Sequence, residues 1–315
     1  MPPEKSIVVV GSINMDLVAR APRMPAPGQT VLGNSFMTSP GGKGANQAVA
    51  LARLGARCRF IGRVGTDAFG EQLLAAMKQE GIDCTDVMAT PEAPTGVALI
   101  IVDAKGENSI VVAPGANHMV TPDDVFSREE AFKLAGVVLL QLELPLPTVR
   151  AAIDVARRNG CRIILDPAPA PATIPAELCR VDIITPNVTE AQVLTGRSAT
   201  DERGDKLVAS DLIERGAQCA VLKLGARGSL VVMADGHFYT VPPYKVEVVD
   251  TTAAGDAFTA ALAMGVACGK SMRDAARFAN AAGALACTKL GAQASMPTLD
   301  DVKAFMIRAA EMEEG

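Results

Sequence analysis

Short apolar runs alternate with helical patterns along this chain, and this alternation constrains the fold more than any other feature. The runs are near-continuous Val, Ile and Leu, which is typical of strands buried on both faces of a sheet. They lie at Ile7–Gly11, Cys58–Val64, Gly136–Gln141, Arg162–Asp166, Asp182–Thr185 and Ala220–Leu224. Helical patterns that end at a glycine lie at Ala68–Glu80, Leu146–Asn159 and Lys206–Arg215, and glycine is common after the last helical turn. The alternation predicts an α/β fold, with a mostly parallel sheet and helices on both faces.

Two segments interrupt this rhythm. Leu17–Ser39 has strand patterns with Pro and Gly but no helix, and Thr95–Ala113 is typical of a β-hairpin with a turn at 103–108. We expect both segments to form one small sheet that projects from the main body.

Composition narrows the class of protein. The chain has 315 residues, of which 49% are hydrophobic, so it is long enough for one large α/β domain or two small ones. The net charge is −5, there is no basic tract, and there are two Tyr and no Trp. A nucleic-acid-binding surface is therefore not expected.

The cysteines, histidines and N-terminus predict a cytoplasmic protein without a metal centre built on histidine. The seven Cys form no C-x-x-C pair and lie mostly in apolar runs, as buried thiols do in a reducing compartment. With only two His, a His-based metal site or a Ser-His-Asp triad has little support. No signal-peptide core and no apolar run of about 18 residues is present, so no membrane partner is expected.

The segment Asp250–Phe258 is the strongest candidate for a chemical site. It follows a strand-like run, Lys245–Val249, and opens a helical run of small residues. The backbone N–H groups of Ala253–Asp256 would point to one spot at a helix N-terminus, where the dipole also favours an anion. Asp256 would place a carboxylate beside that spot, as phosphoryl transfer to a hydroxyl requires. The bland alternative is an Asp favoured in a first helical turn by the dipole alone.

A second glycine-rich helix start lies at Gly41–Ala48. Gly41 and Gly42 permit close backbone approach, and Lys43 and Asn46 are polar groups on the first turn of a helix that runs to Gly55. Alone, a Gly-Gly pair before a helix indicates only a turn.

Taken together, the motifs resemble the ribokinase branch of the PfkB family of carbohydrate kinases. The matching segments, in family order over roughly residues 5–308, are Gly11–Asp16, Pro25–Thr30, Gly41–Gln47, Gln141–Glu143, Asp166–Ala170, Thr185–Glu190, Asp250–Phe258 and Gly291–Gln293. The resemblance implies a three-layer α/β/α fold in one domain over 1–315. It also implies a β lid, from about 15–40 and 95–113, that covers the sugar and makes a homodimer contact.

The resemblance implies ATP-dependent phosphorylation of D-ribose at its 5-hydroxyl, giving D-ribose 5-phosphate and ADP. Asp256 would be the general base, and the N–H groups of Ala253, Ala254, Gly255 and Asp256 would stabilise the transferred group. Many family members have Gly at the position of Ala253. The extra methyl group costs little if the local φ is negative.

The sugar would be bound, by resemblance, by Asn14, Asp16, Gly42, Lys43, Asn46 and Glu143, together with Asp256. Asn14 and Asp16 are two residues apart, so both face the same way in an extended strand; a turn or N-cap pair is the alternative. Glu143 follows an apolar run at the carboxyl end of an expected parallel strand, which is where ligands bind in such sheets.

The nucleotide would be bound, by resemblance, by Asn187, Glu190, Lys223, Gly225, Gly228, Gly255 and Asn280. Asn187 and Glu190 share a helical face and would lie near the phosphates and a hydrated Mg²⁺, although helix capping alone also explains them. A β-hairpin loop explains Lys223–Gly228 equally well. Lys223 departs from the hydroxyl residue common in ribokinases, and Asn280 matches a position near the adenine.

A monovalent cation, K⁺, would be surrounded, by resemblance, by Asp250, Thr252, Ala286, Lys289, Gly291 and Ser295. Most of these residues would act through backbone carbonyls, which suit K⁺.

Other nucleotide-binding signatures fail. Gly265–Ser271 is one residue short of a Walker A motif and lies at the end of a helix, and no G-x-G-x-x-G follows the first strand. Two alternatives stay open: a kinase of 2-deoxyribose or of another sugar or nucleoside, and a non-catalytic sugar or nucleotide sensor. Gly41–Asn46 favours ribose over phosphosugars and adenosine, and the presence of Asp256 argues against a sensor.

Overall fold

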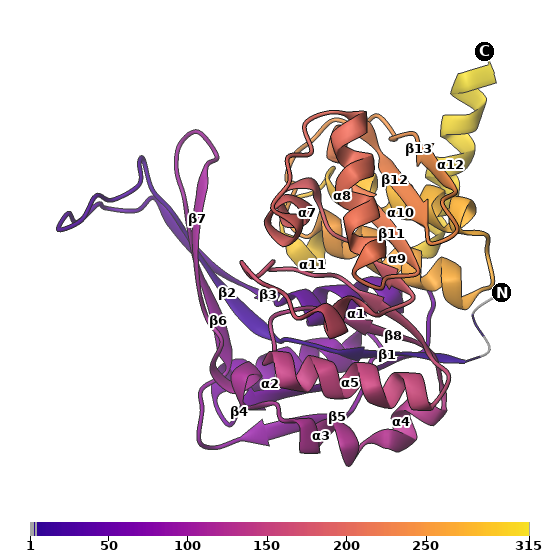
Figure 1. Ribbon diagram of the computed structural model, residues 1–315. Coiled ribbons are helices and arrows are strands. Elements are labelled where there is room, and N and C mark those ends of the chain that lie inside the picture. Colours follow the sequence, from indigo (N-terminus) through magenta and orange to yellow (C-terminus); the bar gives the residue numbers. More distant parts are fainter. Residues whose placement is uncertain (1–2, 4, 315) are drawn as a thin grey trace.

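A nine-stranded sheet forms the body of the molecule in this computed structural model, which describes residue 3 and residues 5–314 (Figure 1). Its order is β13-β12-β11-β10-β9-β8-β1-β4-β5. The strands are β1 (Ser6–Val10), β4 (Cys58–Gly65), β5 (Asp83–Thr90), β8 (Ala135–Leu140), β9 (Arg162–Leu165), β10 (Ile183–Ile184), β11 (Cys219–Lys223), β12 (Ser229–Met233) and β13 (Phe238–Val241). The strands from β11 to β5 pair in parallel, and β12 and β13 are antiparallel. The predicted mostly parallel α/β sheet is confirmed.

Helices cover both faces of this sheet because its strands are apolar on both sides. Ile7 and Val9 of β1 pack in one core, and Val8 and Val10 pack in the other. The first core includes side chains from α1 (Lys43–Arg53), α2 (Ala68–Gln79), α9 (Ala254–Ala267), α10 (Met272–Ala286) and α12 (Leu299–Glu314). The second includes side chains from α3 (Pro122–Phe126), α4 (Glu129–Lys133), α5 (Leu146–Arg158), α6 (Ala176–Cys179), α7 (Val188–Thr195) and α8 (Glu202–Glu214). The three-layer arrangement expected from the resemblance is therefore present.

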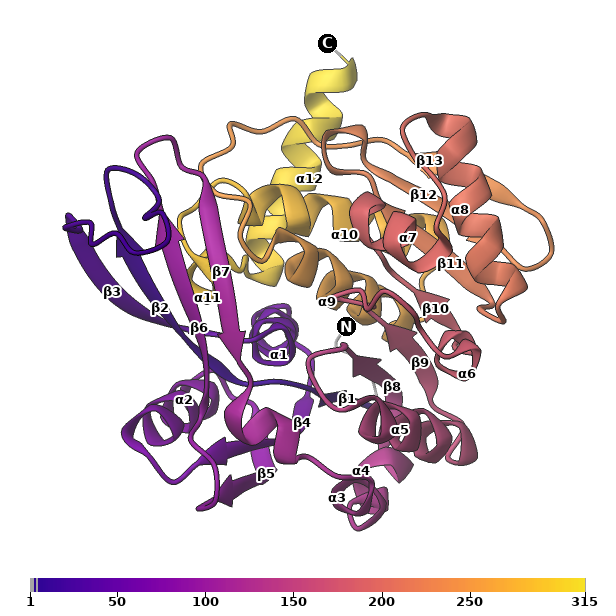
Figure 2. The same cartoon turned by 60° about the vertical axis from the view of Figure 1, so that its left-hand side comes forward.

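A four-stranded second sheet stands away from the body (Figures 1 and 2). Its order is β3-β2-β6-β7, with β2 (Asn14–Arg20), β3 (Ser35–Gly41), β6 (Gly96–Val102) and β7 (Asn108–Ala113). Asn14, at the start of β2, pairs with Gly41 on one side and Gly96 on the other. The two segments that interrupt the strand–helix rhythm thus form one projecting sheet, as predicted.

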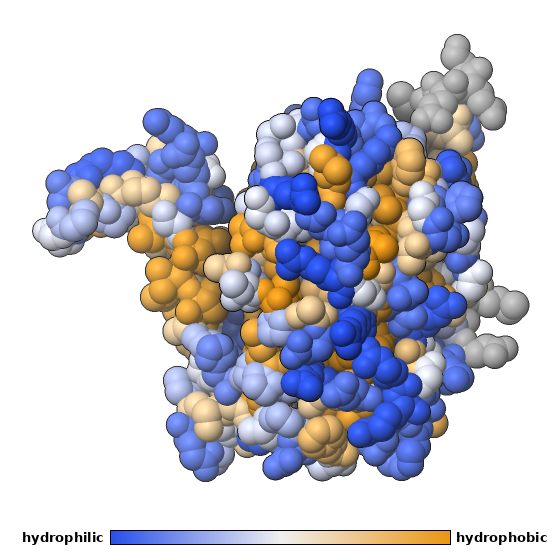
Figure 3. All heavy atoms as spheres, in the orientation of Figure 1, coloured by the Kyte–Doolittle hydropathy of each residue, from blue (hydrophilic) through white to orange (hydrophobic). Residues whose placement is uncertain are grey.

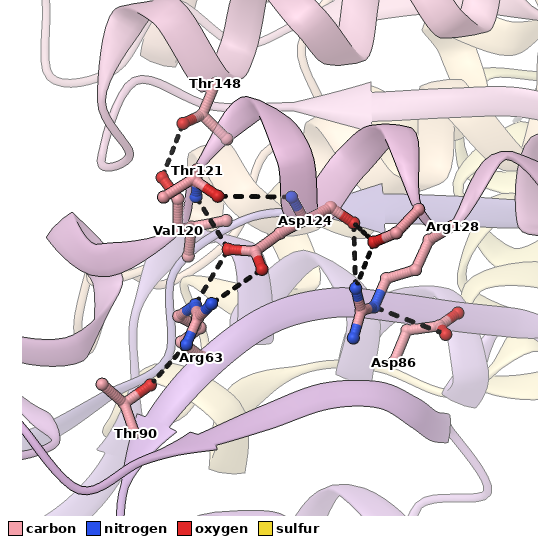
Figure 4. A network of polar contacts seen from close by, with 9 residues as sticks. Arg63, Asp86, Thr90, Val120, Thr121, Asp124, Arg128 and Thr148 are labelled. Carbon is pink, nitrogen blue, oxygen red and sulfur yellow. Dashed lines mark hydrogen bonds and ion pairs between the residues drawn. The ribbon is translucent and has the colours of Figure 1, made fainter.

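A polar network fixes the chain where it leaves this small sheet (Figure 4). Arg63 of β4 makes two hydrogen bonds to Asp124, at 2.9 and 2.7 Å, and Asp124 also closes a capping box with Thr121. The Thr148 hydroxyl of α5 donates to the Val120 carbonyl at 2.6 Å. These bonds anchor the segment after the short 3-10 helix η1 (Gly115–Met119), which follows β7.

Several expected bounds differ from the observed ones. α8 starts at Glu202, four residues before the predicted Lys206, because Asp201 caps it by accepting from the Gly204 N–H at 2.7 Å. The expected strand at Asp182–Thr185 is only Ile183–Ile184.

The strand predicted at Lys245–Val249 is absent, so that prediction is wrong. The segment follows Pro242 and Pro243, which cannot donate to a ladder. The Val249 N–H bonds the Cys287 carbonyl after α10 instead of a neighbouring strand.

The prediction that most cysteines are buried free thiols is confirmed at five positions, Cys58, Cys84, Cys161, Cys179 and Cys219. Within the described part of the chain, no helix has both the length and the apolar character needed to cross a bilayer.

Candidate active site

Both glycine-rich helix starts meet at the carboxyl edge of the main sheet, around Asp256. This carboxylate is 5% exposed and lies in the first turn of α9. Its two oxygens accept hydrogen bonds from α1: Asn46 Nδ2 donates to Oδ2 at 2.9 Å, and Gln47 Nε2 donates to Oδ1 at 3.0 Å. The sequence prediction placed Asn46 here as a sugar ligand but gave Gln47 no role.

Burial raises the pKa of Asp256 to about 6. The cation of Lys43 opposes this rise in pKa, Asp166 adds to it, and the bonds from Asn46 and Gln47 oppose it. Asp256 is thus ionised at neutral pH, yet it is a stronger base than an exposed Asp, which suits a general base.

Unpaired N–H groups adjoin this carboxylate at the start of α9. Among the described residues, the N–H groups of Ala253, Gly255 and Asp256 have no hydrogen-bond partner, as expected in the first turn of a helix. The Ala254 N–H donates to the Thr251 carbonyl at 3.2 Å. Three of the four N–H groups named for the anion site are therefore free to bind an anion, and the fourth is occupied.

The sequence analysis assumed a negative φ at Ala253, and the structure does not have it. Its φ is 58°, and among the described residues it is the only non-glycine residue with positive φ. A Cβ in this left-handed region costs about 1 kcal/mol relative to glycine. The glycine common in the family avoids this strain, and the alanine of this chain bears it.

A cavity of about 380 Å³ opens in front of the α9 N-terminus. It is lined by Lys43, Asp166, Asn187, Glu190, Lys223, Gly225, Thr251, Ala253, Gly255 and Asp256. Candidate residues from four predicted motifs, distant in sequence, thus share one cavity because their strands end at the same edge of the sheet.

Lys43 is the central cation of this cavity. Its burial disfavours charge, but Asp256, Asp166, Glu143 and Glu190 together hold the pKa of Lys43 above its ordinary value. The ammonium group is therefore charged at any physiological pH.

Lys223 and Asp166 add a second, nearly buried charge pair. Lys223 Nζ lies 2.8 Å from Asp166 Oδ1, and the two side chains are 11% and 1% exposed. A Cβ built on Gly255 would lie 3.5 Å from Lys223 Nζ, so the ammonium group adjoins the anion-binding turn. Asp166 Oδ2 accepts from Gln47 Nε2 at 2.9 Å and from the Thr259 hydroxyl at 3.3 Å.

The expected sugar-binding side chains lie where β1, β2 and β8 approach α1. Asn14 Oδ1 accepts from Asn117 Nδ2 at 2.7 Å. Glu143 Oε2 accepts from the Ser12 hydroxyl at 2.5 Å and the Lys43 N–H at 3.1 Å. Ser12 and Asn117, which hold these groups, were not identified from the sequence.

Asp16 is the other carboxylate of this group. Burial raises the pKa of Asp16 to about 7, with further contributions from Glu143 and Asp256. The three carboxylates are thus close enough to repel one another. Gly42 has φ 89°, and a Cβ there would lie 2.7 Å from the Asn14 nitrogen, so only glycine fits.

Asn187 and Glu190 form the capping box of α7. Asn187 Oδ1 accepts from the Glu190 N–H, and Glu190 Oε2 accepts from the Asn187 N–H, both at 2.8 Å. The capping alternative is confirmed, and both residues also face the cavity.

Two residues expected to bind the nucleotide, Asn280 and Gly228, contact the backbone at the end of β13. Asn280 Nδ2 donates to the carbonyls of Val241 and Pro242, at 3.2 and 2.9 Å. A Cβ on Gly228 would lie 2.2 Å from the Val241 carbonyl. Neither residue lines the 380 Å³ cavity. The hairpin alternative for Lys223–Gly228 is confirmed by the antiparallel pairing of β11 and β12 through η2 (Gly225–Arg227).

The expected cation residues lie in the loop before α9 and in the segment from the end of α10 to α11, and Asp250 joins these two segments. Asp250 Oδ2 accepts from the Gly291 N–H at 2.9 Å, and Oδ1 accepts from the Thr252 N–H at 2.9 Å. Ser295 is buried in α11 (Ala292–Ser295), where its hydroxyl donates to the Ala292 carbonyl at 2.8 Å. Among the described residues, no three His, Cys, Asp or Glu side chains are grouped to hold a metal ion.

Comparison with known proteins agrees with this geometry. Residues 4–299 match the family described as pfkB family carbohydrate kinase. A ribokinase of Haemophilus influenzae is 40% identical over 305 residues, which are 97% of this chain and 99% of that protein. A deoxyribokinase of Salmonella typhi is 33% identical over 301 residues, 95% of this chain and 98% of that protein.

A solved structure has the same fold. The ribokinase of Arabidopsis thaliana complexed with ribose and ATP is 34% identical and superposes with a TM-score of 0.90, covering 97% of this chain and 99% of that one. The family match over residues 4–299, the similar sequences and the shared fold show that this chain belongs to the pfkB family of carbohydrate kinases.

Proposed function

We propose that this protein transfers the γ-phosphoryl group of ATP to the 5-hydroxyl of D-ribose, giving D-ribose 5-phosphate and ADP. The observation that carries the proposal is the buried Asp256 beside unpaired N–H groups at the start of α9. The similar proteins named ribokinase, at 40% and 34% identity, support the choice of sugar.

Asp256 is the general base in this proposal. It accepts the proton of the 5-hydroxyl as that oxygen attacks the γ-phosphorus, and the phosphoryl group leaves the β-phosphate oxygen. The N–H groups of Gly255 and Asp256 stabilise the negative charge on the transferred oxygens. Lys43 and Lys223 add positive charge on the same side of the cavity.

Ribose is held by side chains around the start of β2 and α1. Asn14, Asp16 and Glu143 accept or donate hydrogen bonds to its ring hydroxyls, with Gly42, Lys43 and Asn46 closing the site from α1. Met15 takes no part, because its side chain is fully buried in the core. The alternation of a strand directs Asn14 and Asp16 to the other face.

ATP lies along the edge formed by α7, η2 and α10. Asn187, Glu190, Lys223, Gly225 and Gly255 bound the phosphate end, while Gly228 and Asn280 shape the backbone beside the adenine. Mg²⁺ bound with the nucleotide would neutralise charge on the phosphate oxygens, and Glu190 would hold water molecules of that ion.

K⁺ would raise activity by binding between the two segments that Asp250 joins. Its ligands would be carbonyl and side-chain oxygens among Asp250, Thr252, Ala286, Lys289, Gly291 and Ser295. The bond from Asp250 to the Gly291 N–H supports this placement because it keeps both segments together beside α9.

The chain acts as a single domain, with the small sheet as a lid. Residues 15–40 and 95–113 would close over the sugar and exclude water that competes for the phosphoryl group. Apolar side chains gather on this sheet (Figure 3). By the strand register, the exposed side chains of Phe36, Leu99 and Val111 share one face, and those of Met37 and Ile110 lie on the other. The apolar face with Phe36, Leu99 and Val111 supports a homodimer formed lid to lid.

Release of ADP tests the proposal. Purified protein with Mg²⁺ and ATP would be offered ribose, 2-deoxyribose, fructose or adenosine, in K⁺ or in Na⁺ buffer, and the sugar product identified by NMR. We expect ribose 5-phosphate to form fastest, with stimulation by K⁺. Preference for another acceptor would refute ribose but not the kinase. No turnover with any acceptor would refute the kinase.

A further inference from the structure

A large groove lies at the opposite edge of the main sheet from the candidate active site. Its volume is about 1110 Å³, and it is lined near the amino ends of β1, β8 and β9 by Lys5, Gly136 and Arg162. The candidate site lies past the carboxyl ends of the same strands. The six residues of β8 alone separate the two edges by about 20 Å. In Figure 1 this edge faces away from the small sheet.

The floor of the groove is apolar. Met264 and Val266 of α9, Phe278 of α10, and Leu299, Met306 and Ile307 of α12 line it. Ile307 is 59% exposed, so the apolar surface is open to solvent. A concave apolar surface of this size is the usual character of a small-molecule site.

The rim of the groove is strongly cationic, although the whole chain carries a net charge of −5. Five cations line it: Lys5, Arg162, Lys270, Arg277 and Lys303. Asp274 is the one acidic residue among the described lining residues, and its carboxylate already accepts the Ser271 hydroxyl at 2.6 Å. Like charges gathered in one groove repel one another, so an anionic partner would stabilise them.

Among the described residues, four of these exposed cations are unpaired, as are exposed cations elsewhere such as Lys78 and Arg203. Within the described residues, Lys5, Arg162, Lys270 and Arg277 make no ion pair and no side-chain hydrogen bond. By contrast, Arg53 pairs with Glu80, and Arg63 with Asp124. The guanidinium groups of Arg162 and Arg277 therefore keep all their donors for a ligand.

We propose that this groove is a second binding site, for a small organic anion with an apolar body and two or more negative charges. The apolar body would cover the floor from α9, α10 and α12, and phosphate or carboxylate groups would bind the cations at the rim. The segment Gly265–Ser271, whose sequence only approaches a Walker A motif, supplies Lys270 to this rim. The site is separate from catalysis and does not depend on the proposed sugar.

Binding of the aromatic disulfonate dye bis-ANS tests this proposal. The full-length protein is first saturated with ribose and ADP so that the catalytic cavity is filled, and the dye is then titrated by fluorescence. The groove variant combines Arg162→Ala with Arg277→Ala. The matched control combines Lys78→Ala with Arg203→Ala, which removes two exposed cations outside the groove, the catalytic cavity and the lid.

We expect the dissociation constant of the dye to rise about tenfold or more in the groove variant and to stay unchanged in the control, because charged hydrogen bonds are lost only in the former. Equal affinity for both variants would overturn the proposal and place the dye elsewhere, for example on the small sheet. Both variants should keep normal turnover with ribose.

Displacement of bound dye tests whether the ligand needs an apolar body in addition to negative charge. ATP and hexadecanedioate each have an apolar body and two or more negative charges, whereas tripolyphosphate has charge alone. Displacement by ATP or hexadecanedioate at concentrations where tripolyphosphate has no effect would support the proposal and separate nucleotides from fatty dicarboxylates as its source. Equal displacement by tripolyphosphate would overturn the requirement for an apolar body.

Discussion

Replacing Gln47 by Met should move the acid limb of the activity profile to higher pH. In the structure, Gln47 Nε2 donates to Asp256 Oδ1 at 3.0 Å, and this bond helps to hold down the pKa of Asp256, which burial raises to about 6. Methionine has a similar length and helix propensity but has no N–H group. The bond from Asn46 to Oδ2 is untouched.

The size of the shift follows from the lost bond. A hydrogen bond to a charged acceptor contributes about 1.5–3 kcal/mol, and about 1.4 kcal/mol corresponds to one pKa unit. The pKa of Asp256 should therefore rise from about 6 to about 7–8. At pH 6.5 the ionised fraction in the free enzyme, and with it kcat/KM, should fall about eightfold if the new pKa is near 7.5, while kcat/KM at pH 9 should change little.

The assay is kcat/KM for ribose against pH, because this ratio reports the pKa of the enzyme before the sugar binds. Thr148→Val is the matched control, because it also removes a buried hydrogen bond, of 2.6 Å to Val120, but lies away from the cavity (Figure 4). We expect the control to keep the wild-type profile. An unshifted acid limb in folded Gln47→Met protein would refute the assignment of this limb to Asp256.

Three further predictions concern the anion site, the nucleotide and the lid. Ala253→Gly should stabilise the protein by about 1 kcal/mol in urea denaturation, because φ is 58° there; a loss of stability would contradict the left-handed conformation. Lys223→Ser should raise KM for ATP about tenfold with a smaller effect on KM for ribose; an unchanged KM for ATP would remove Lys223 from the phosphate site. Val111→Asp, at a side chain 64% exposed on the small sheet, should lower the mass in light scattering from twice the chain mass of 32.7 kDa to that of one chain; a dimer that survives would contradict pairing through this face.

The architecture could be predicted from the sequence because each apolar run by itself indicates a strand that is buried on both faces. Runs such as Cys58–Val64 are apolar on both faces, so they predict central strands whatever their neighbours are. Lys245–Val249 also has a strand-like pattern, but it forms no strand, and its Val249 N–H donates to the Cys287 carbonyl after α10 instead. Whether an apolar run becomes a strand depends on its partner, which composition does not reveal.

The site was predictable where a polar residue follows a strand or opens a helix. Asn14, Glu143, Asn187 and Asp256 all stand at such places. Asp166 also follows a strand directly, after β9, but the sequence analysis named it only within the segment Asp166–Ala170 and predicted no role for it. Its role becomes visible when Lys223 and Gln47 are found bonded to it.

Other members of the site have no sequence signal. Asn117 lies in η1, far along the chain from Asn14, and only the pairing of β2 with β6 brings it within 2.7 Å of Asn14 Oδ1. The positive φ of Ala253 is likewise invisible in the sequence, since alanine usually avoids that conformation.

The most direct test of the central claim is turnover of ribose by Asp256→Asn and Asp256→Ala, measured together with ribose binding by calorimetry. Loss of the base should lower kcat by about 10²–10⁴-fold. The dissociation constant for ribose should change little in at least one variant, because Asn14, Asp16 and Glu143 are unaltered. Turnover within tenfold of wild type, in protein that still binds ribose, would contradict Asp256 as the general base.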